Sequence, residues 1–184
     1  IEELAARTGR RLVMEVEPGT YIVANAGWVV TSVLDVKRTG ADGFEFLVCD
    51  GGMEVNTRPL LYGSRHPFYL VSADGRLKSS EYDLAGLDPE RDLRVVVGRC
   101  CESGDSQSLD EAGHIVPRLM APAEPGDYLV VGGAGAYCAS MSPFNCNSHV
   151  QAPEVLVRSD GTLYLVRRGQ TLEQITANEV GLAP

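Results

Sequence analysis

Glycine and proline interrupt this chain at short, irregular intervals, and this feature limits most strongly the folds open to it. The sequence has 20 Gly and 10 Pro among its 184 residues, and neither recurs at a fixed period. Both residues are disfavoured inside helices and common in turns. The runs between them are short and rich in β-branched and apolar residues, which favours strands. The pattern therefore predicts a mainly β protein with many short strands and argues against a helical bundle.

The longest apolar run, over residues 20–38, is expected to be a strand with a bulge or bend at 25–27. Residues 44–50 are expected to pair with it across the glycine-containing turn at 40–43. Residues 51–67 are polar and rich in Gly and Pro, which is typical of a loop. Further strands are predicted at 68–75, 92–101 and 128–131, and in a hairpin over 154–168 with Asp160-Gly161 at its tip.

Short helices are expected at the two ends of the chain. Residues 2–12 begin with acids and end with bases around Gly9, as the last turns of a helix would. A second short helix is predicted after Thr171, whose hydroxyl can cap it. The fold class predicted is a Greek-key-like β barrel or sandwich with a short C-terminal helix.

Charge and composition exclude several classes of protein. With 16 Lys and Arg against 25 Asp and Glu, the net charge of -9 disfavours nucleic acid as a partner. No apolar run approaches the ~20 residues that span a bilayer, so no membrane partner is expected. Five cysteines without a C-x-x-C pair argue against a disulfide framework or zinc site and favour a reducing, cytoplasmic location. The three histidines are far apart, and no metal site is expected.

Five polar segments could carry chemistry. Glu17 opens the first apolar run, although most such acids are simple turn residues. Arg58 and Tyr62 lie four residues apart, and a guanidinium beside a phenol can hold a carboxylate. The alternative reading is a surface ion pair and a core aromatic residue.

The other three segments follow later strands. The segment from Cys101 to Asp105 offers a thiol and two carboxylates, those of Glu102 and Asp105, which would suit an ammonium group or a proton. The alternative is a solvated acidic turn with a buried, inert cysteine. Tyr137 ends a stretch of small residues at 132–136, which is expected to let the backbone approach another segment closely. Its hydroxyl could donate to a phosphate oxygen, or it could be an ordinary half-buried aromatic residue. Ser142-Pro143-Phe144-Asn145 by itself indicates a turn.

Taken in order, these segments resemble the C-terminal part of the fold-type III PLP-dependent amino-acid decarboxylases, most closely the diaminopimelate decarboxylase branch, which serves lysine biosynthesis. The resemblance is carried by EPGTYIVANAG at 17–27, DGGMEVNTRPLLYG at 50–63, CESGD at 101–105, GDYLVVGGAGAY at 126–137 and SPFN at 142–145. It implies that residues 1–27 end an N-terminal PLP-binding α/β barrel and that 28–184 form the C-terminal β domain. It also implies a homodimer whose sites are shared between subunits.

The resemblance assigns roles to six residues. Glu17 would pair with the pyridine nitrogen of the cofactor, pyridoxal 5'-phosphate, and Tyr137 would contact its phosphate or stack near its ring. The substrate carboxylate would be held by Arg58 and Tyr62. Across the dimer interface, Cys101 would donate a proton in the partner's site, where Glu102 would pair with the distal amine of a diamino or basic amino acid.

Two departures from the family pattern matter. Thr20 stands where the family motif has Arg, which leaves the diaminopimelate specificity open. Neither Lys37 nor Lys78 matches the lysine that holds the cofactor, so this chain alone is expected to be inactive. The alternative is a non-catalytic relative in which the β domain serves dimerisation or regulation.

Overall fold

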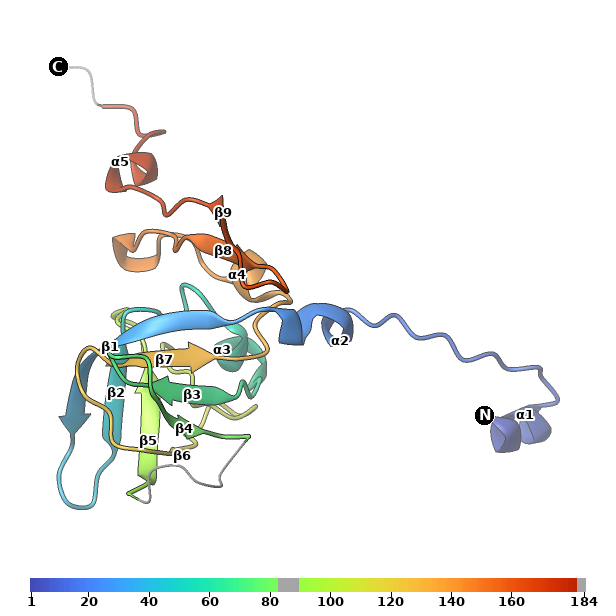
Figure 1. The fold of residues 1–184 in the computed structure, drawn as a ribbon. Helices are drawn as coiled ribbons and strands as arrows, with labels where there is room; N and C mark the ends of the chain where they lie inside the picture. Colours follow the sequence, from blue (N-terminus) through green and yellow to red (C-terminus); the bar gives the residue numbers. More distant parts are fainter. Residues whose placement is uncertain (83–89, 182–184) are drawn as a thin grey trace.

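The computed structural model describes residues 1–82 and 90–181 and is built around one seven-stranded sheet (Figure 1). A separate two-stranded hairpin follows it along the chain. The strands of the large sheet are β1 (Val29–Arg38), β2 (Glu45–Cys49), β3 (Phe68–Val71), β4 (Leu77–Ser80), β5 (Asp92–Val97), β6 (Arg118–Met120) and β7 (Tyr128–Val131). The hairpin consists of β8 (Glu154–Val157) and β9 (Leu163–Arg167).

The large sheet has the order β4-β3-β7-β1-β2-β5-β6 and curls into a barrel-like shape. Strand β7 lies between β1 and β3 and pairs antiparallel with both, whereas β2 and β5 pair in parallel. The expected β1–β2 hairpin forms, with Val36 opposite Leu47. The prediction of a mainly β, barrel-like domain is confirmed.

Side chains join the two edge strands and nearly close the barrel. The Nε of Arg118, in β6, donates to Oε1 of Glu81, which directly follows β4, over 2.7 Å. The backbone N–H of Ala121 donates to the hydroxyl of Ser79 over 3.2 Å. An open edge strand exposes unpaired backbone groups, so these bonds protect both edges.

The interior of the barrel is a single apolar cluster. Its side chains come from alternate positions of the strands, as the two-residue period of a strand requires. It is formed by Val33, Leu47, Cys49, Phe68, Leu70, Val96, Met120, Ala121, Leu129 and Val131.

The helices are short and lie outside the barrel. They are α1 (Glu2–Thr8), α2 (Thr20–Val23), η1 (Ala24–Ala26), α3 (Arg58–Tyr62), α4 (Cys138–Met141), η2 (Cys146–Ser148) and α5 (Leu172–Ile175). The predicted helix ends are confirmed: Gly9 closes α1 in a left-handed conformation, and the Thr171 hydroxyl caps α5 within a capping box. None of the helices in the described part of the chain has the length and apolar run that crossing a bilayer requires.

One prediction was wrong. Residues 20–26 form α2 and η1 rather than the start of a strand, and only Val29–Arg38 is extended. The Ala24 carbonyl, in the second of these turns, accepts a bond from the backbone N–H of Gly135, so a contact distant in sequence outweighs the local β propensity. Within the loop predicted over 51–67, the five residues of α3 are also helical.

Candidate functional site

Three segments far apart in sequence meet at one end of the barrel: residues 20–27, helix α3 and the glycine-rich loop after β7. Backbone bonds join the first and third, since Ala134 N–H donates to the Gly27 carbonyl over 2.9 Å and Gly135 N–H to the Ala24 carbonyl over 2.8 Å. Helix α3 is tied to the segment after the loop because Thr57 N–H donates to the Ser142 hydroxyl over 3.2 Å. These contacts set where the polar side chains of the three segments lie.

Glycine is required where the loop and residues 20–27 touch. A Cβ on Gly135 would lie 1.9 Å from the Val23 carbonyl oxygen, and a Cβ on Gly27 would lie 2.5 Å from the Gly135 Cα. Both distances are far below van der Waals contact, so only glycine fits at either position. The expectation that the small residues allow a close backbone approach is confirmed.

Arg58, Tyr62 and Tyr137 form a cluster at this junction. The guanidinium carbon of Arg58 lies 5.2 Å from the ring centre of Tyr62 and 5.7 Å from that of Tyr137, within cation–π range. Tyr137 adopts a left-handed backbone conformation, with φ 63°. Such a conformation is uncommon for a bulky residue and is maintained only by its surroundings. A guanidinium and two phenols are donor groups that suit an anionic group.

Glu17 lies in the exposed chain that leads away from the barrel toward α1 (Figure 1). Two residues later this chain reaches the cluster, because a Cβ on Gly19 would lie 2.7 Å from the Tyr137 hydroxyl. Thr20 is exposed at the start of α2. The structure thus brings Tyr137 against the EPGT motif, while the carboxylate of Glu17 stays open to solvent.

Cys101 and Glu102 lie in the turn after β5, and both are exposed. The Cys101 N–H donates to Oδ1 of Asn147 over 2.8 Å, and Oε1 of Glu102 accepts bonds within its own turn. Among the residues that the structure describes, neither has a hydrogen bond to the Arg58 cluster. The turn does contact α3, since a Cβ on Gly104 would lie 2.4 Å from a methyl group of Leu60.

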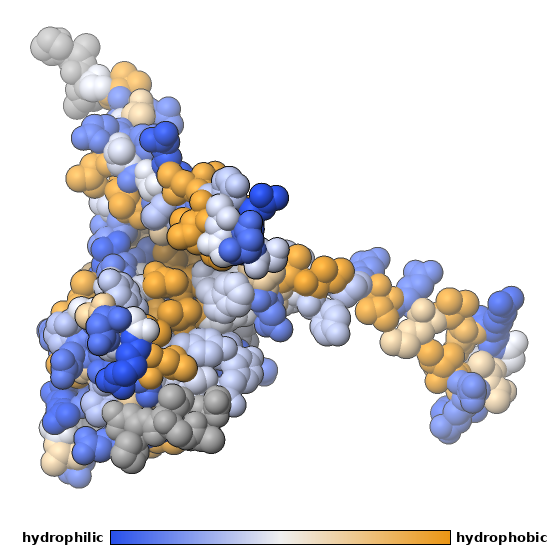
Figure 2. Space-filling view, viewed as in Figure 1, coloured by the Kyte–Doolittle hydropathy of each residue, from blue (hydrophilic) through white to orange (hydrophobic). Residues whose placement is uncertain are grey.

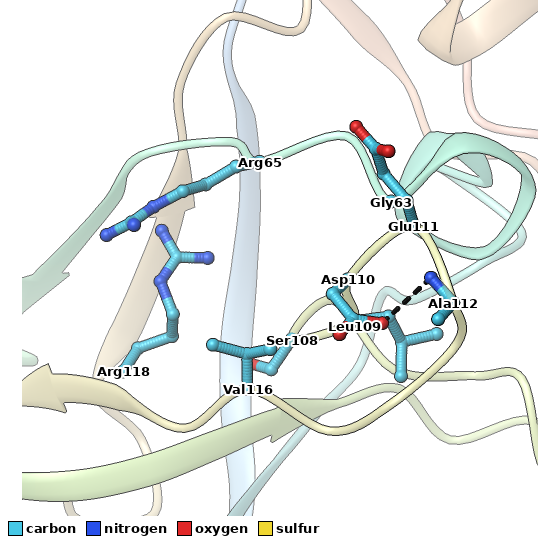
Figure 3. Close-up of a pocket in the computed structure, with 9 residues that line it drawn as sticks. All are labelled: Gly63, Arg65, Ser108, Leu109, Asp110, Glu111, Ala112, Val116 and Arg118. Atoms are coloured by element: carbon cyan, nitrogen blue, oxygen red, sulfur yellow. Dashed lines mark hydrogen bonds between the residues drawn. The ribbon is translucent and has the colours of Figure 1, made fainter.

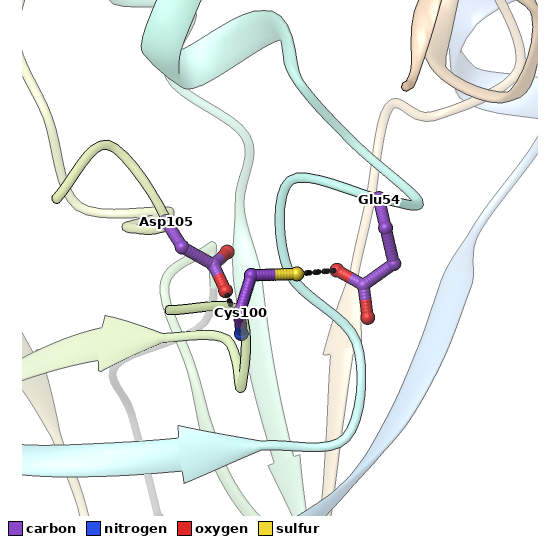
Figure 4. A group of neighbouring side chains, drawn as sticks. All are labelled: Glu54, Cys100 and Asp105. Carbon is purple, nitrogen blue, oxygen red and sulfur yellow. Dashed lines mark hydrogen bonds between the residues drawn. The ribbon is translucent and has the colours of Figure 1, made fainter. Parts of the chain in front are cut away.

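Asp105 is buried and holds this turn in place. Its two carboxylate oxygens accept separate backbone bonds of 2.7 Å, from Met53 N–H and Cys100 N–H. Burial, together with the nearby Glu54 carboxylate, raises the pKa of Asp105 despite these bonds. Figure 4 shows the Cys100 thiol between the two carboxylates, where burial and both negative charges raise its pKa. Cys100 is therefore a neutral thiol and a structural neighbour of the exposed Cys101.

A separate cavity, lined by residues within 63–65 and 108–118, contains none of the six predicted site residues. It has a volume of about 500 Å³, with Arg65 and Arg118 at one end and Asp110 at the other (Figure 3). Arg118 is held by Glu81, and Asp110 accepts the backbone N–H groups of Ala112 and His114. The charged groups of Arg118 and Asp110 therefore already have hydrogen-bond partners within the fold.

Sequence reasoning noted the carboxylate of Asp105 but not its role as a backbone acceptor, and it gave His66 no role. Asp105 was visible as the last residue of CESGD, but its acceptor role depends on Met53, 52 residues away. His66 is buried beside the glycine-rich loop and bonds to Gly132. The only local sign was its position directly before Pro67, at the start of a strand.

Comparison with known proteins identifies the family. Residues 20–135 match the family described as the pyridoxal-dependent decarboxylase, C-terminal sheet domain, and the chain belongs to this family. It is similar to diaminopimelate decarboxylase of Escherichia coli K12, with 39% identity over 180 residues, covering 97% of this chain and 40% of that protein. The resemblance derived from the five motifs is confirmed.

Solved structures agree with the sequence match. A crystal structure of diaminopimelate decarboxylase superimposes with a TM-score of 0.78 at 38% identity, covering 97% of this chain and 39% of the other. The Helicobacter pylori diaminopimelate decarboxylase complexed with L-lysine gives a TM-score of 0.69 at 28% identity, covering 96% and 37%. The chain therefore spans about two fifths of the length of the relatives it matches.

Proposed function

We propose that this chain is the C-terminal domain of a PLP-dependent decarboxylase that acts on meso-diaminopimelate or a similar basic amino acid. The observation that carries the proposal is the cluster of Arg58, Tyr62 and Tyr137 beside the EPGT segment, in a chain of this family. Relatives that match nearly the whole chain are diaminopimelate decarboxylases, and one of them was crystallised with L-lysine.

The donor set of the cluster fits the cofactor and substrate. The Tyr137 hydroxyl, held at the glycine-rich loop, suits a phosphate oxygen, and Glu17 would face the pyridine nitrogen. When bound, PLP supplies the electron sink for loss of CO2. Arg58 and Tyr62 would orient the substrate by its distal carboxylate, because a guanidinium gives two parallel donors to such a group.

The remaining two residues would act in the second subunit of a cytoplasmic homodimer. Cys101 and Glu102 are exposed on the turn after β5, so they are free to enter another site. Cys101 would deliver a proton to the substrate carbon that has lost CO2, and Glu102 would pair with the distal amine. The buried Asp105 would hold this turn at a fixed distance from α3.

The chain also exposes apolar surface that other domains or subunits could cover. Figure 2 shows apolar side chains on the β8–β9 hairpin and along the N-terminal segment. In the hairpin, Leu156 and Leu163 are 53% and 66% exposed. Apolar surface of this extent marks an interaction site. An α/β barrel domain and a second subunit are the partners proposed for it.

The lysine that binds PLP would come from that barrel. Lys78 is buried in an ion pair with Asp127, its Nζ 2.8 Å from Oδ2, and Lys37 is exposed on β1 beside Asp35. Neither lysine adjoins the Arg58 cluster in sequence or in the described contacts. The chain without a barrel domain is therefore expected to release no CO2.

The test is CO2 release by the whole protein, meaning this chain joined to its barrel domain, with PLP present. The substrates are meso-diaminopimelate, lysine, ornithine and arginine, each at the same concentration. The proposal predicts turnover of meso-diaminopimelate and its loss in Arg58→Ala, with Arg158→Ala as a control on an exposed arginine of the hairpin. Bound PLP without turnover of any substrate would favour the alternative, a non-catalytic relative. Thr20, in place of the family's Arg, is the sequence feature that favours this alternative.

A further inference from the structure

One backbone hydrogen bond cannot form where β3 and β7 begin to pair, and a side chain replaces it. The two strands pair antiparallel with Phe68 opposite Val131, so the next pair along the ladder is Pro67 and Gly132. A hydrogen-bonded pair of this kind exchanges two bonds, one from each N–H. The Gly132 N–H does donate to the Pro67 carbonyl over 2.9 Å. Proline has no N–H, so the backbone cannot supply the return bond to the Gly132 carbonyl.

His66 supplies that bond from its ring. Its Nδ1 lies 2.9 Å from the Gly132 carbonyl oxygen, and the side chain is almost completely buried, with 6% of the residue exposed. A carbonyl oxygen only accepts, so Nδ1 must carry the proton. Burial and the charges of Arg58 and Arg118 lower the pKa of His66, which keeps the ring neutral with a bare Nε2. That Nε2 is buried and has no hydrogen-bond partner within the described residues.

The backbone of His66 is itself fixed. Its carbonyl accepts a bond of 2.9 Å from Arg118, whose guanidinium is paired with Glu81 at the closed edge of the barrel. The ring thus connects a rigid part of the barrel to the first residue of the glycine-rich loop. Five residues later the loop reaches Tyr137, after the two backbone bonds to residues 20–27.

We infer that His66 is a positioning residue: its Nδ1–H replaces the N–H that Pro67 lacks, and so fixes the Gly132 peptide from which the loop carries Tyr137 to Arg58. A glycine peptide with an unbound carbonyl rotates easily, because Gly132 has no side chain and Gly133 already has φ 67°. The role of Tyr137 toward the cofactor rests on the proposed function, whereas the bond and its effect on the loop do not.

The first test uses hydrogen exchange in the whole protein, this chain joined to its barrel domain, read at the amides of Ala134 and Gly135. His66→Phe keeps an aromatic ring but removes the donor, and we expect exchange at both amides to rise by about tenfold, the factor of one net hydrogen bond. His66→Asn keeps an N–H near the position of Nδ1 and should stay within about threefold of the wild type. Unchanged exchange in His66→Phe would overturn the inference.

The second test restores the missing backbone donor. In the double variant His66→Phe/Pro67→Ala, residue 67 has an N–H that can reach the Gly132 carbonyl, so exchange should return toward the wild-type rate. Pro67→Ala alone is the matched control. A double variant that exchanges as fast as, or faster than, His66→Phe would show that the loop does not depend on a donor to the Gly132 carbonyl, and would contradict the inference.

The third test links the bond to the site in the whole protein. PLP affinity, measured from cofactor absorbance, should fall by about tenfold in His66→Phe and recover in the double variant, with the denaturation midpoint reported alongside. If the wild type binds no PLP, the proposed function fails while the exchange result still decides the role of His66. If PLP affinity is unchanged while exchange rises, the loop is fixed by His66 but Tyr137 is not positioned by it, which would overturn the second half of the inference.

Discussion

Replacing Asp105 should release the turn that carries Cys101 and Glu102. The carboxylate accepts two backbone bonds of 2.7 Å, one on each oxygen, from Met53 and Cys100. Hydrogen bonds to a charged group contribute about 1.5–3 kcal/mol each, so their loss in Asp105→Ala would cost roughly 3–6 kcal/mol. Burial of the charge, which raises the pKa of Asp105, offsets part of this. We expect a net loss of about 2–4 kcal/mol in the free energy of unfolding.

The variant Asp105→Asn distinguishes the contributions of the two hydrogen bonds, because it keeps only one acceptor. The amide keeps one acceptor oxygen and turns an N–H group toward the other backbone donor, so its cost should fall between those of the wild type and Asp105→Ala. The assay is urea denaturation followed by circular dichroism, in which about 3 kcal/mol moves the midpoint by roughly 1–2 M. Asp160→Ala is the control, since its carboxylate also accepts a backbone N–H, from Thr162, but at an exposed hairpin tip.

The outcome that would refute this reasoning is a midpoint for Asp105→Ala no lower than that of Asp160→Ala. It would mean that the backbone N–H groups of Met53 and Cys100 find water or other partners without cost. The turn would then be held by other contacts, such as that of Gly104 with Leu60.

Three further substitutions test other parts of the structure. Gly135→Ala would place a Cβ 1.9 Å from a backbone oxygen, so limited proteolysis should cleave residues 20–27 faster than in Gly161→Ala, where only the positive φ opposes a Cβ. Lys78→Met leaves Asp127 as an unpaired buried charge and should lower stability by about 3–5 kcal/mol in chemical denaturation at pH 7; an unchanged midpoint would contradict a buried ion pair. Folding lowers the pKa of His66, so its contribution to the free energy of unfolding is full above about pH 6.5 and is lost as the pH falls toward the folded pKa. The urea midpoints at pH 7.5 and 5.5 should therefore differ less in His66→Asn than in the wild type.

Local sequence signals predicted the parts of the fold that depend on neighbours in the chain. The turn between β1 and β2, the β8–β9 hairpin and the Thr171 cap all follow from residues within a few positions of one another. Residues 20–26 were mistaken for a strand because their helical turns are held by Gly135, more than a hundred positions later. The sequence contains no local sign of that contact.

The candidate site likewise contains residues linked by local spacing and residues that only the fold brings together. Arg58 and Tyr62 share one short helix, so their spacing of four residues predicted that the two side chains lie together. Tyr137 joins them only through the fold, and the five motifs in their family order were needed to place it. The roles of Asp105 and His66 could not be predicted, because each bonds to a backbone group from another part of the chain, at Met53 and Gly132 respectively. Patterns of side chains do not reveal backbone partners of this kind.

The central claim is that this domain completes a decarboxylase site shared between two subunits, and mixing two inactive variants of the whole protein tests it most directly. If the proposed roles hold, Arg58→Ala disables the site of its own subunit, whereas Cys101→Ala disables that of the partner. In a hybrid dimer one site has both residues intact, so random reassociation should restore about a quarter of the wild-type CO2 release from meso-diaminopimelate. Activity that stays at the level of the separate variants would contradict the account, because Arg58 and Cys101 would then serve the same site from one subunit or not serve it at all.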